Sequence, residues 1–223
     1  MDNRGPLFTL LAVAVLFFVL LGINVSKRVE PARQAASPPT VVVPTATTTA
    51  AAGSATTTSA TAAFPAEASY VGRTTKGDAS IAITVKGGKA VAYLCDGRKT
   101  EAWLQGTATN GVLSLQGRGG AQLTGEVAGE RMSGTVSTGG AEWSFTASSA
   151  RTPAGLYRAN AAVSGVPSKI GWIVQPDGSE VGILNRNGAV EPAPPLGPGA
   201  STVILEQGAR VPVEHVTGDS GTG

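Results

Sequence analysis

Cysteine and histidine are nearly absent from this chain of 223 residues, which contains one of each, Cys95 and His215. A single cysteine excludes an intrachain disulfide, and so few soft ligands exclude a cysteine- or histidine-rich metal site. We therefore predict that the chain holds no metal. By strand alternation Cys95 shares a face with Val91 and Tyr93, which predicts a buried thiol; a free thiol that bridges two chains is the alternative.

The residues needed for nucleophilic catalysis are equally scarce. His215 lies beside Glu214 in the last predicted strand, and no Gly-x-Ser-x-Gly elbow is present to supply a nucleophile. The glycines after Arg118 do not follow a phosphate-loop or dinucleotide pattern. We predict no catalytic residues and no cofactor, so the protein is not expected to be an enzyme; an enzyme of unknown type stays as an alternative.

Charge and aromatic residues are also sparse, at 14% and 5% of the chain. The region from Glu67 to Val216 carries 13 basic and 12 acidic residues, a net charge of +1, without a basic run. Nucleic acid is therefore not an expected partner.

A long apolar segment is present at the N-terminus, where Leu7–Val25 contains no charged residue. As a helix these residues would span roughly 28 Å, close to the thickness of a bilayer core. The run is longer than the apolar part of a signal peptide, and no Ala-x-Ala follows it. We predict an uncleaved membrane anchor within residues 1–30.

The orientation of this anchor receives conflicting signals. Lys27, Arg28 and Arg33 follow the run, and the positive-inside rule alone would place that side in the cytoplasm. Residues 31–66, in contrast, form a Thr/Ala/Ser/Pro-rich stretch, uncharged from Gln34 onward, which is typical of a disordered, often O-glycosylated extracellular stalk; a plain flexible linker is the alternative. We predict a single-pass membrane protein with its C-terminal domain extracytoplasmic.

Residues 67–216 show the pattern of an all-β domain. Turn pairs such as Asn110-Gly111 and Gly139-Gly140 recur every nine to thirteen residues, and apolar and polar residues alternate between them. Ile81, Ile83 and Val85, for example, share one face of a strand. Successive hairpins with one apolar face predict an antiparallel meander that closes as a small β-barrel or sandwich.

The second part of this region, residues 151–216, is less regular. Gln175-Pro176-Asp177-Gly178 predicts a hairpin turn, and Pro212 predicts an edge position for the last strand. The strands of 151–216 either complete the first barrel or form a subdomain beside 67–150. Residues 217–223 are expected to form a disordered tail.

One residue is a candidate for binding. Trp103 shares a strand face with Glu101 and Gln105, so it is either exposed, where it could contact a sugar or a protein, or within a partly polar barrel. The function expected is a non-catalytic binding or accessory module of the cell envelope. A small-molecule or lipid carrier is the alternative, because the inward glycines Gly125 and Gly134 leave room for a modest cavity.

Four features together resemble membrane-anchored, uncharacterised envelope proteins of actinobacteria. They are the run Leu7–Val25, the linker through Thr61, and the strings Ala92-Tyr93-Leu94-Cys95-Asp96-Gly97 and Gly171-Trp172-Ile173-Val174-Gln175-Pro176-Asp177-Gly178. The resemblance implies a location in the envelope, and it implies no mechanism. The partner expected for the binding or accessory module is an envelope protein complex or a wall polymer.

Overall fold

The structure, a computed structural model, describes residues 63–163, 165–197, 199, 201–205 and 208–223. The predicted anchor Leu7–Val25 and nearly all of the predicted linker lie outside these residues. Within the described part of the chain, no helix is both long and apolar enough to cross a membrane.

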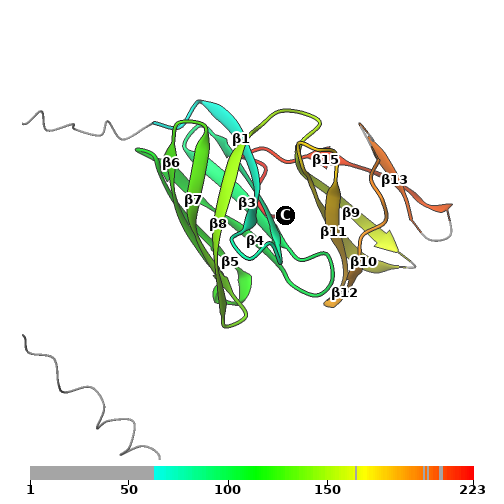
Figure 1. The fold of residues 1–223 in the computed structure, drawn as a ribbon. Coiled ribbons are helices and arrows are strands. Elements are labelled where there is room, and N and C mark those ends of the chain that lie inside the picture. The colour runs from blue at the N-terminus through cyan, green and yellow to red at the C-terminus, as the bar shows by residue number, and fades with distance from the viewer. Residues whose placement is uncertain (1–62, 164, 198, 200, 206–207) are drawn as a thin grey trace, which may run out of the picture. The chain divides into compact units, whose positions relative to one another are not determined.

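The first eight strands form a closed antiparallel barrel (Figure 1). Each strand pairs with the next along the chain, and β1 pairs with β8 to close the ring. Between β4 and β5, Asn110 and Gly111 take the positive φ angles, 51° and 77°, that the Asn-Gly pair predicts. The strands are β1 (Glu67–Thr74), β2 (Ser80–Lys86), β3 (Lys89–Cys95), β4 (Glu101–Thr109), β5 (Val112–Gly117), β6 (Gln122–Ala128), β7 (Arg131–Thr138) and β8 (Ala141–Ala150), with a 3₁₀ turn, η1 (Arg118–Gly120), between β5 and β6.

The predicted all-β fold is confirmed, and of the two predicted forms the structure shows the barrel. Large side chains fill its interior, including the fully buried Ile81, Leu104, Leu113 and Met132. The inward glycine Gly125 opens no cavity inside the barrel, because an added Cβ would lie 3.0 Å from the carbonyl oxygen of Ser133 and 3.4 Å from the ring of Phe145. Gly125 and Gly134 border an open surface hollow of about 330 Å³ instead. Eight strands enclose a space that side chains can fill, and here they do so.

The remaining strands form two further sheets after the barrel has closed. The five-stranded sheet has the order β12-β11-β10-β9-β15, and the predicted turn Gln175–Gly178 joins β10 to β11. Pro212 lies in a two-stranded sheet formed by β13 and β14. The strands are β9 (Gly155–Val163), β10 (Val166–Val174), β11 (Glu180–Arg186), β12 (Ala189–Pro192), β13 (Thr202–Ile204), β14 (Arg210–Pro212) and β15 (Glu214–His215).

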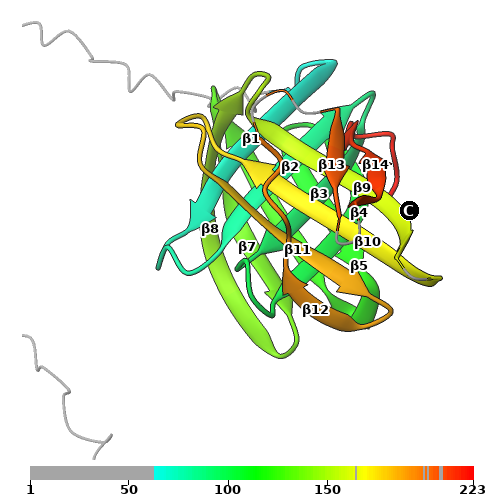
Figure 2. The ribbon, with the colours of Figure 1, turned by 90° about the vertical axis from the view of Figure 1, so that its right-hand side faces the viewer.

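The five-stranded sheet packs on the outside of the barrel, over β1, β2 and β3 (Figures 1 and 2). Val91 and Tyr93 of the barrel meet Leu156, Ile173 and Ile183 of this sheet in one buried cluster. The prediction of strands with one buried face therefore holds for β5 and β6, where buried and exposed residues alternate. It is wrong for β2 and β3, which are buried on both faces.

The last seven residues, 217–223, differ from the disordered tail that the sequence predicts. The segment is held against the domain by specific contacts. Gly218 packs against the β2–β3 turn, where an added Cβ would lie 2.3 Å from the backbone nitrogen of Lys86. Asp219 forms an ion pair with Lys86 at 3.5 Å, and Thr222 donates its backbone N–H to Gln105 Oε1 at 3.1 Å. These partners lie far away in sequence, which is why local composition does not reveal them.

Candidate functional site

Trp103, the weak binding candidate, lies on the outer face of β4 where the barrel meets the five-stranded sheet. Its ring packs against Tyr93 of β3, with centroids 4.3 Å apart and planes tilted by 31°. The Nζ atom of Lys169, from β10, lies 4.2 Å from the ring centroid in a cation–π arrangement. The Trp103 ring is thus already in contact with a barrel side chain and with a cation from the five-stranded sheet.

The indole nitrogen of Trp103 has an unusual environment. Nε1 is buried, and no hydrogen-bond acceptor lies within reach of it among the residues that the structure describes. An unpaired buried donor costs about 1–3 kcal/mol. Trp103 thus holds two sheets together while keeping one polar group unsatisfied.

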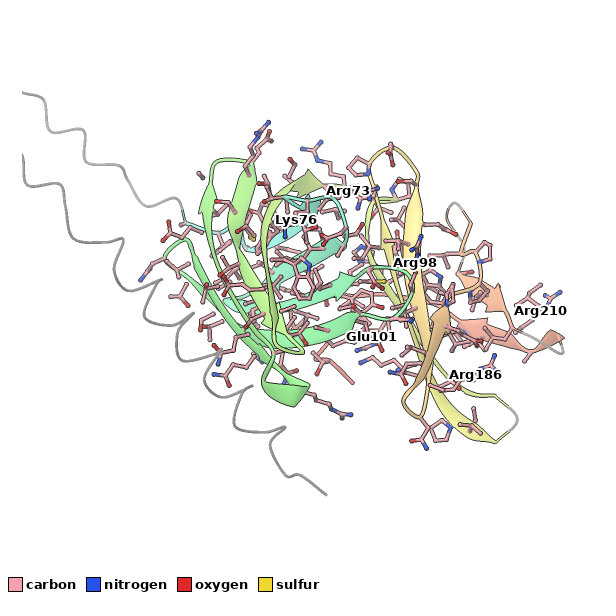
Figure 3. The ribbon with its side chains drawn as sticks, turned by 60° about the horizontal axis from the view of Figure 1, so that its bottom comes forward. Arg73, Lys76, Arg98, Glu101, Arg186 and Arg210 are labelled. Carbon is pink, nitrogen blue, oxygen red and sulfur yellow. The ribbon has the colours of Figure 1, made fainter. Side chains whose placement is uncertain are left out.

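Glu101 lies two residues before Trp103 on the same strand face, and Figure 3 shows it between the barrel and the five-stranded sheet. Its Oε2 accepts a hydrogen bond from the Tyr93 hydroxyl at 3.0 Å, and its Oε1 accepts one from Asn185 Nδ2 of β11 at 2.7 Å. The carboxylate is thereby fixed in position by one group from the barrel and one from the five-stranded sheet.

Lys169 is a partly desolvated cation. Its Nζ donates to the main-chain oxygens of Thr222 and Gly223. Burial lowers the pKa of Lys169 to about 8, and the positive charge of Arg158 contributes to the lowering, while Glu101 acts in the opposite direction. Arg158 itself is buried on β9, where it donates to Gly221 O at 3.0 Å and to Glu214 Oε2 at 3.1 Å.

These groups surround a cleft of about 240 Å³, which we call the Trp103 cleft. It contains two cationic side chains, those of Lys169 and Arg118, and one carboxylate, that of Glu101. Arg118 lies on the exposed 3₁₀ turn, and its side chain forms no hydrogen bond or ion pair within the described ranges. The full lining is Glu101, Ala102, Trp103, Arg118, Lys169, Asn185, Thr222 and Gly223.

A second cavity of about 240 Å³ lies on the other side of the five-stranded sheet. It is lined mainly by apolar residues such as Tyr157, Val174 and Leu196. Its polar groups serve the fold itself, since the Tyr157 hydroxyl donates to Pro153 O and Glu180 accepts from the backbone N–H of Leu196. The Trp103 cleft is the better candidate because its charged groups converge on open space.

The structure does not bring His215 and Cys95 together with partners for catalysis. His215 is exposed and meets Tyr157 edge-on, with centroids 5.0 Å apart, and partial desolvation lowers its pKa. Cys95 is buried beneath the five-stranded sheet as predicted, and burial raises its pKa to about 11. Among the residues that the structure describes, no group of three or more His, Cys, Asp or Glu side chains is placed to hold a metal ion.

The sequence indicates one wall of the cleft and not the other. Trp103, Glu101 and Gln105 share a strand face, which alternation shows directly. Lys169, Asn185 and Arg118 come from distant segments, and nothing in their local sequence indicates that they meet Trp103. The only available signal was an aromatic residue flanked by polar ones on a strand face.

Comparison with known proteins adds no relative. No protein-family model matches the chain, and neither a curated protein nor a solved structure matches it significantly. Function must therefore be inferred from the sequence, the fold and the chemistry of the cleft.

Proposed function

We propose that this chain is a non-catalytic binding module of the cell envelope, tethered to the membrane by Leu7–Val25 with its β-domain on the extracytoplasmic side. The apolar run and the uncharged stretch that follows it support the tether and its location. The Trp103 cleft is the binding site of this module. The resemblance to actinobacterial envelope proteins points to the same location.

The observation that carries the proposal is the contrast between the inside and the outside of the barrel. Fully buried side chains, such as Leu113, Leu123 and Met132, fill the interior. The charged and polar groups instead gather in an open cleft beside the barrel. A carrier with a hollow barrel would have the reverse arrangement, so the filled interior favours the binding module over that alternative.

The enzyme alternative receives less support from the cleft. Both oxygens of Glu101 are engaged by Tyr93 and Asn185, and the cleft lining contains no histidine or cysteine. General acid–base chemistry needs a group that can exchange its proton with a substrate. The groups of the Trp103 cleft are better suited to holding a ligand than to transforming one.

Crosslinking in intact cells tests the proposal. Cells that produce the full-length chain are treated with a lysine- or carboxyl-reactive crosslinker, and the material joined to the chain is identified. We expect recovery of an envelope component, and at least fivefold lower recovery with the cleft variant Lys169→Met/Arg118→Gln. Arg131→Gln, an exposed cation on β7, is the matched control and should recover the wild-type amount.

Two results would count against the binding module. Equal recovery with the wild type and the cleft variant would remove the cleft from the proposal, and recovery of cytoplasmic proteins alone would contradict the location. Protease treatment of intact cells provides an independent test of orientation, since an extracytoplasmic domain should be cut while a cytoplasmic marker is spared.

A further inference from the structure

The Trp103 cleft has an imbalance of charge. Lys169 and Arg118 both border it, and neither forms an ion pair among the described residues. The single carboxylate, Glu101, already accepts hydrogen bonds from Tyr93 and Asn185. Two cationic side chains therefore border the same open space as one side-chain carboxylate.

The described hydrogen bonds of Lys169 leave one of its donors for a ligand. The main-chain oxygens of Thr222 and Gly223 accept from two of its three N–H groups, and the Trp103 ring lies against the ammonium group. A desolvated cation of this kind interacts more strongly with an added anion than an exposed lysine does, because the local dielectric constant is lower. The site is thus prepared for an anionic group.

Other groups in the cleft are suited to hydrogen-bonding with the hydroxyl groups of a ligand rather than to binding its charged group. Each carboxylate oxygen of Glu101 accepts one hydrogen bond within the protein and has a further lone pair for a ligand hydroxyl. Asn185 uses Nδ2 toward Glu101 and Oδ1 toward the backbone N–H of Gly188, so its amide is fixed beside the cleft. A ligand that bears an anion at one end and hydroxyls at the other would meet complementary groups along the whole cleft.

The size of the cleft limits the ligand. Its volume of about 240 Å³ is just below the roughly 300–1,000 Å³ that is usual for drug-sized ligands. One ring-sized unit is therefore favoured over an extended chain of residues.

From these observations, and on the basis of the binding role proposed above, we propose that the Trp103 cleft binds an acidic saccharide unit, a hydroxylated ring that carries a carboxylate or phosphate. Lys169 and Arg118 bind the anionic group. Glu101 and Asn185 hydrogen-bond to the ring hydroxyls. Trp103 fixes the position of Lys169 and does not stack on the sugar.

Titration calorimetry on the purified full-length chain in a neutral detergent tests this assignment, with glucuronate as the probe. Glucose, acetate and inorganic phosphate serve as comparison ligands that carry only one of the two features. We expect saturable binding of glucuronate at least tenfold tighter than that of each comparison ligand, and weaker binding at high salt because the contact is ionic.

Variants connect this binding to the cleft. Lys169→Met and Arg118→Gln should each weaken glucuronate binding at least fivefold, whereas Lys169→Arg, which retains the charge, should weaken it less. Arg131→Gln, on the far strand β7, should bind as the wild type does. Thermal unfolding of each variant shows whether the fold is retained, and Lys169→Arg keeps the test valid if Lys169→Met unfolds.

Three results would overturn the assignment. They are absence of saturable glucuronate binding, equal affinity for acetate or phosphate, which would indicate an adventitious ion only, and equal weakening by Arg131→Gln. Any of these would leave the crosslinking test untouched, because that test does not presuppose a saccharide. Recovery of a protein partner through the cleft would therefore uphold the binding module while glucuronate titration rejects the saccharide.

Discussion

The ammonium group of Lys169 lies 4.2 Å from the centroid of the Trp103 ring, although the two residues belong to different sheets. Trp103 lies on barrel strand β4 and Lys169 on β10 of the sheet that covers the barrel. The backbone permits this approach because residue 171 is a glycine, where an added Cβ would lie 2.6 Å from the Trp103 ring. The contact therefore joins the packing of the two sheets to the charge of the cleft.

The pH dependence of stability should reveal Lys169. Its pKa in the folded chain is about 8, against 10.5 for an unperturbed lysine, so between these values the unfolded chain retains a proton that the folded chain releases. The free energy of unfolding from this group must then rise with pH through that window. The charged groups that act on Lys169 are Arg158 of β9, Glu101 of β4 and Arg118 of η1.

Denaturant unfolding at pH 7.5 and pH 8.8 measures this effect. From pH 7.5 to pH 8.8 the free energy of unfolding of the wild type should rise relative to that of Lys169→Met, which lacks the titrating group. The higher of the two pH values is kept below 9.0, the ordinary pKa of a cysteine thiol. Above that pH the unfolded chain loses the thiol proton while the folded chain, in which the pKa of Cys95 is about 11, retains it, so Cys95 makes the free energy of unfolding fall. Identical pH slopes in both proteins would show that Lys169 titrates normally.

Two substitutions at Trp103 should separate its ring from its nitrogen. Trp103→Phe retains an aromatic ring against Tyr93 and Lys169 and removes the buried N–H that has no acceptor among the described residues, so stability should change by less than ~1 kcal/mol. Trp103→Ala removes the ring and should cost ~3 kcal/mol, as loss of a large aromatic side chain usually does. Urea unfolding of the three proteins measures both values, and equal losses would show that a phenyl ring at this position does not retain the contacts of the indole ring.

The strand pattern of the barrel could be predicted because it depends on local alternation. Ile81, Ile83 and Val85 face inward, as expected from their spacing, and Asn110-Gly111 forms the expected turn. Alternation carries no information about what covers the outward face of a strand. The burial of Val91 therefore depends on a sheet that is formed some seventy residues later in the chain.

The cleft was predictable only on its barrel side, for the same reason. Trp103 and Glu101 lie two residues apart on one strand, so their shared face follows from the period of a strand. Lys169 and Asn185 reach them through tertiary packing. The cleft also includes Thr222 and Gly223, which belong to a segment whose composition indicates disorder.

Cys95 should be unreactive in the folded protein. It lies beneath the five-stranded sheet, and burial raises its pKa from 9.0 to about 11, which reduces the thiolate fraction at neutral pH about 100-fold. Reaction with a thiol-specific disulfide reagent at pH 7.5 should thus be at least about 100-fold slower in native buffer than in denaturant. Non-reducing electrophoresis provides a second readout, and a native disulfide-linked dimer would contradict the buried position.

Gly218→Ala should release the segment 217–223 from the domain. An added Cβ would lie 2.3 Å from the Lys86 nitrogen and 2.6 Å from the Lys89 carbonyl oxygen, both of them backbone atoms that cannot move independently. We expect a loss of ~1–3 kcal/mol, typical of overpacking, with faster amide exchange at Thr222 as its contact with Gln105 is lost.

Gly139→Ala is the control, because a Cβ there meets nothing within 4 Å and only its φ of 57° is strained. Since Thr222 and Gly223 accept from Lys169, release of the segment should also change the environment of Trp103, whereas Gly139→Ala should not. Unchanged exchange at Thr222 in Gly218→Ala would show that the contacts of residues 219–223 hold the segment without the fit of Gly218.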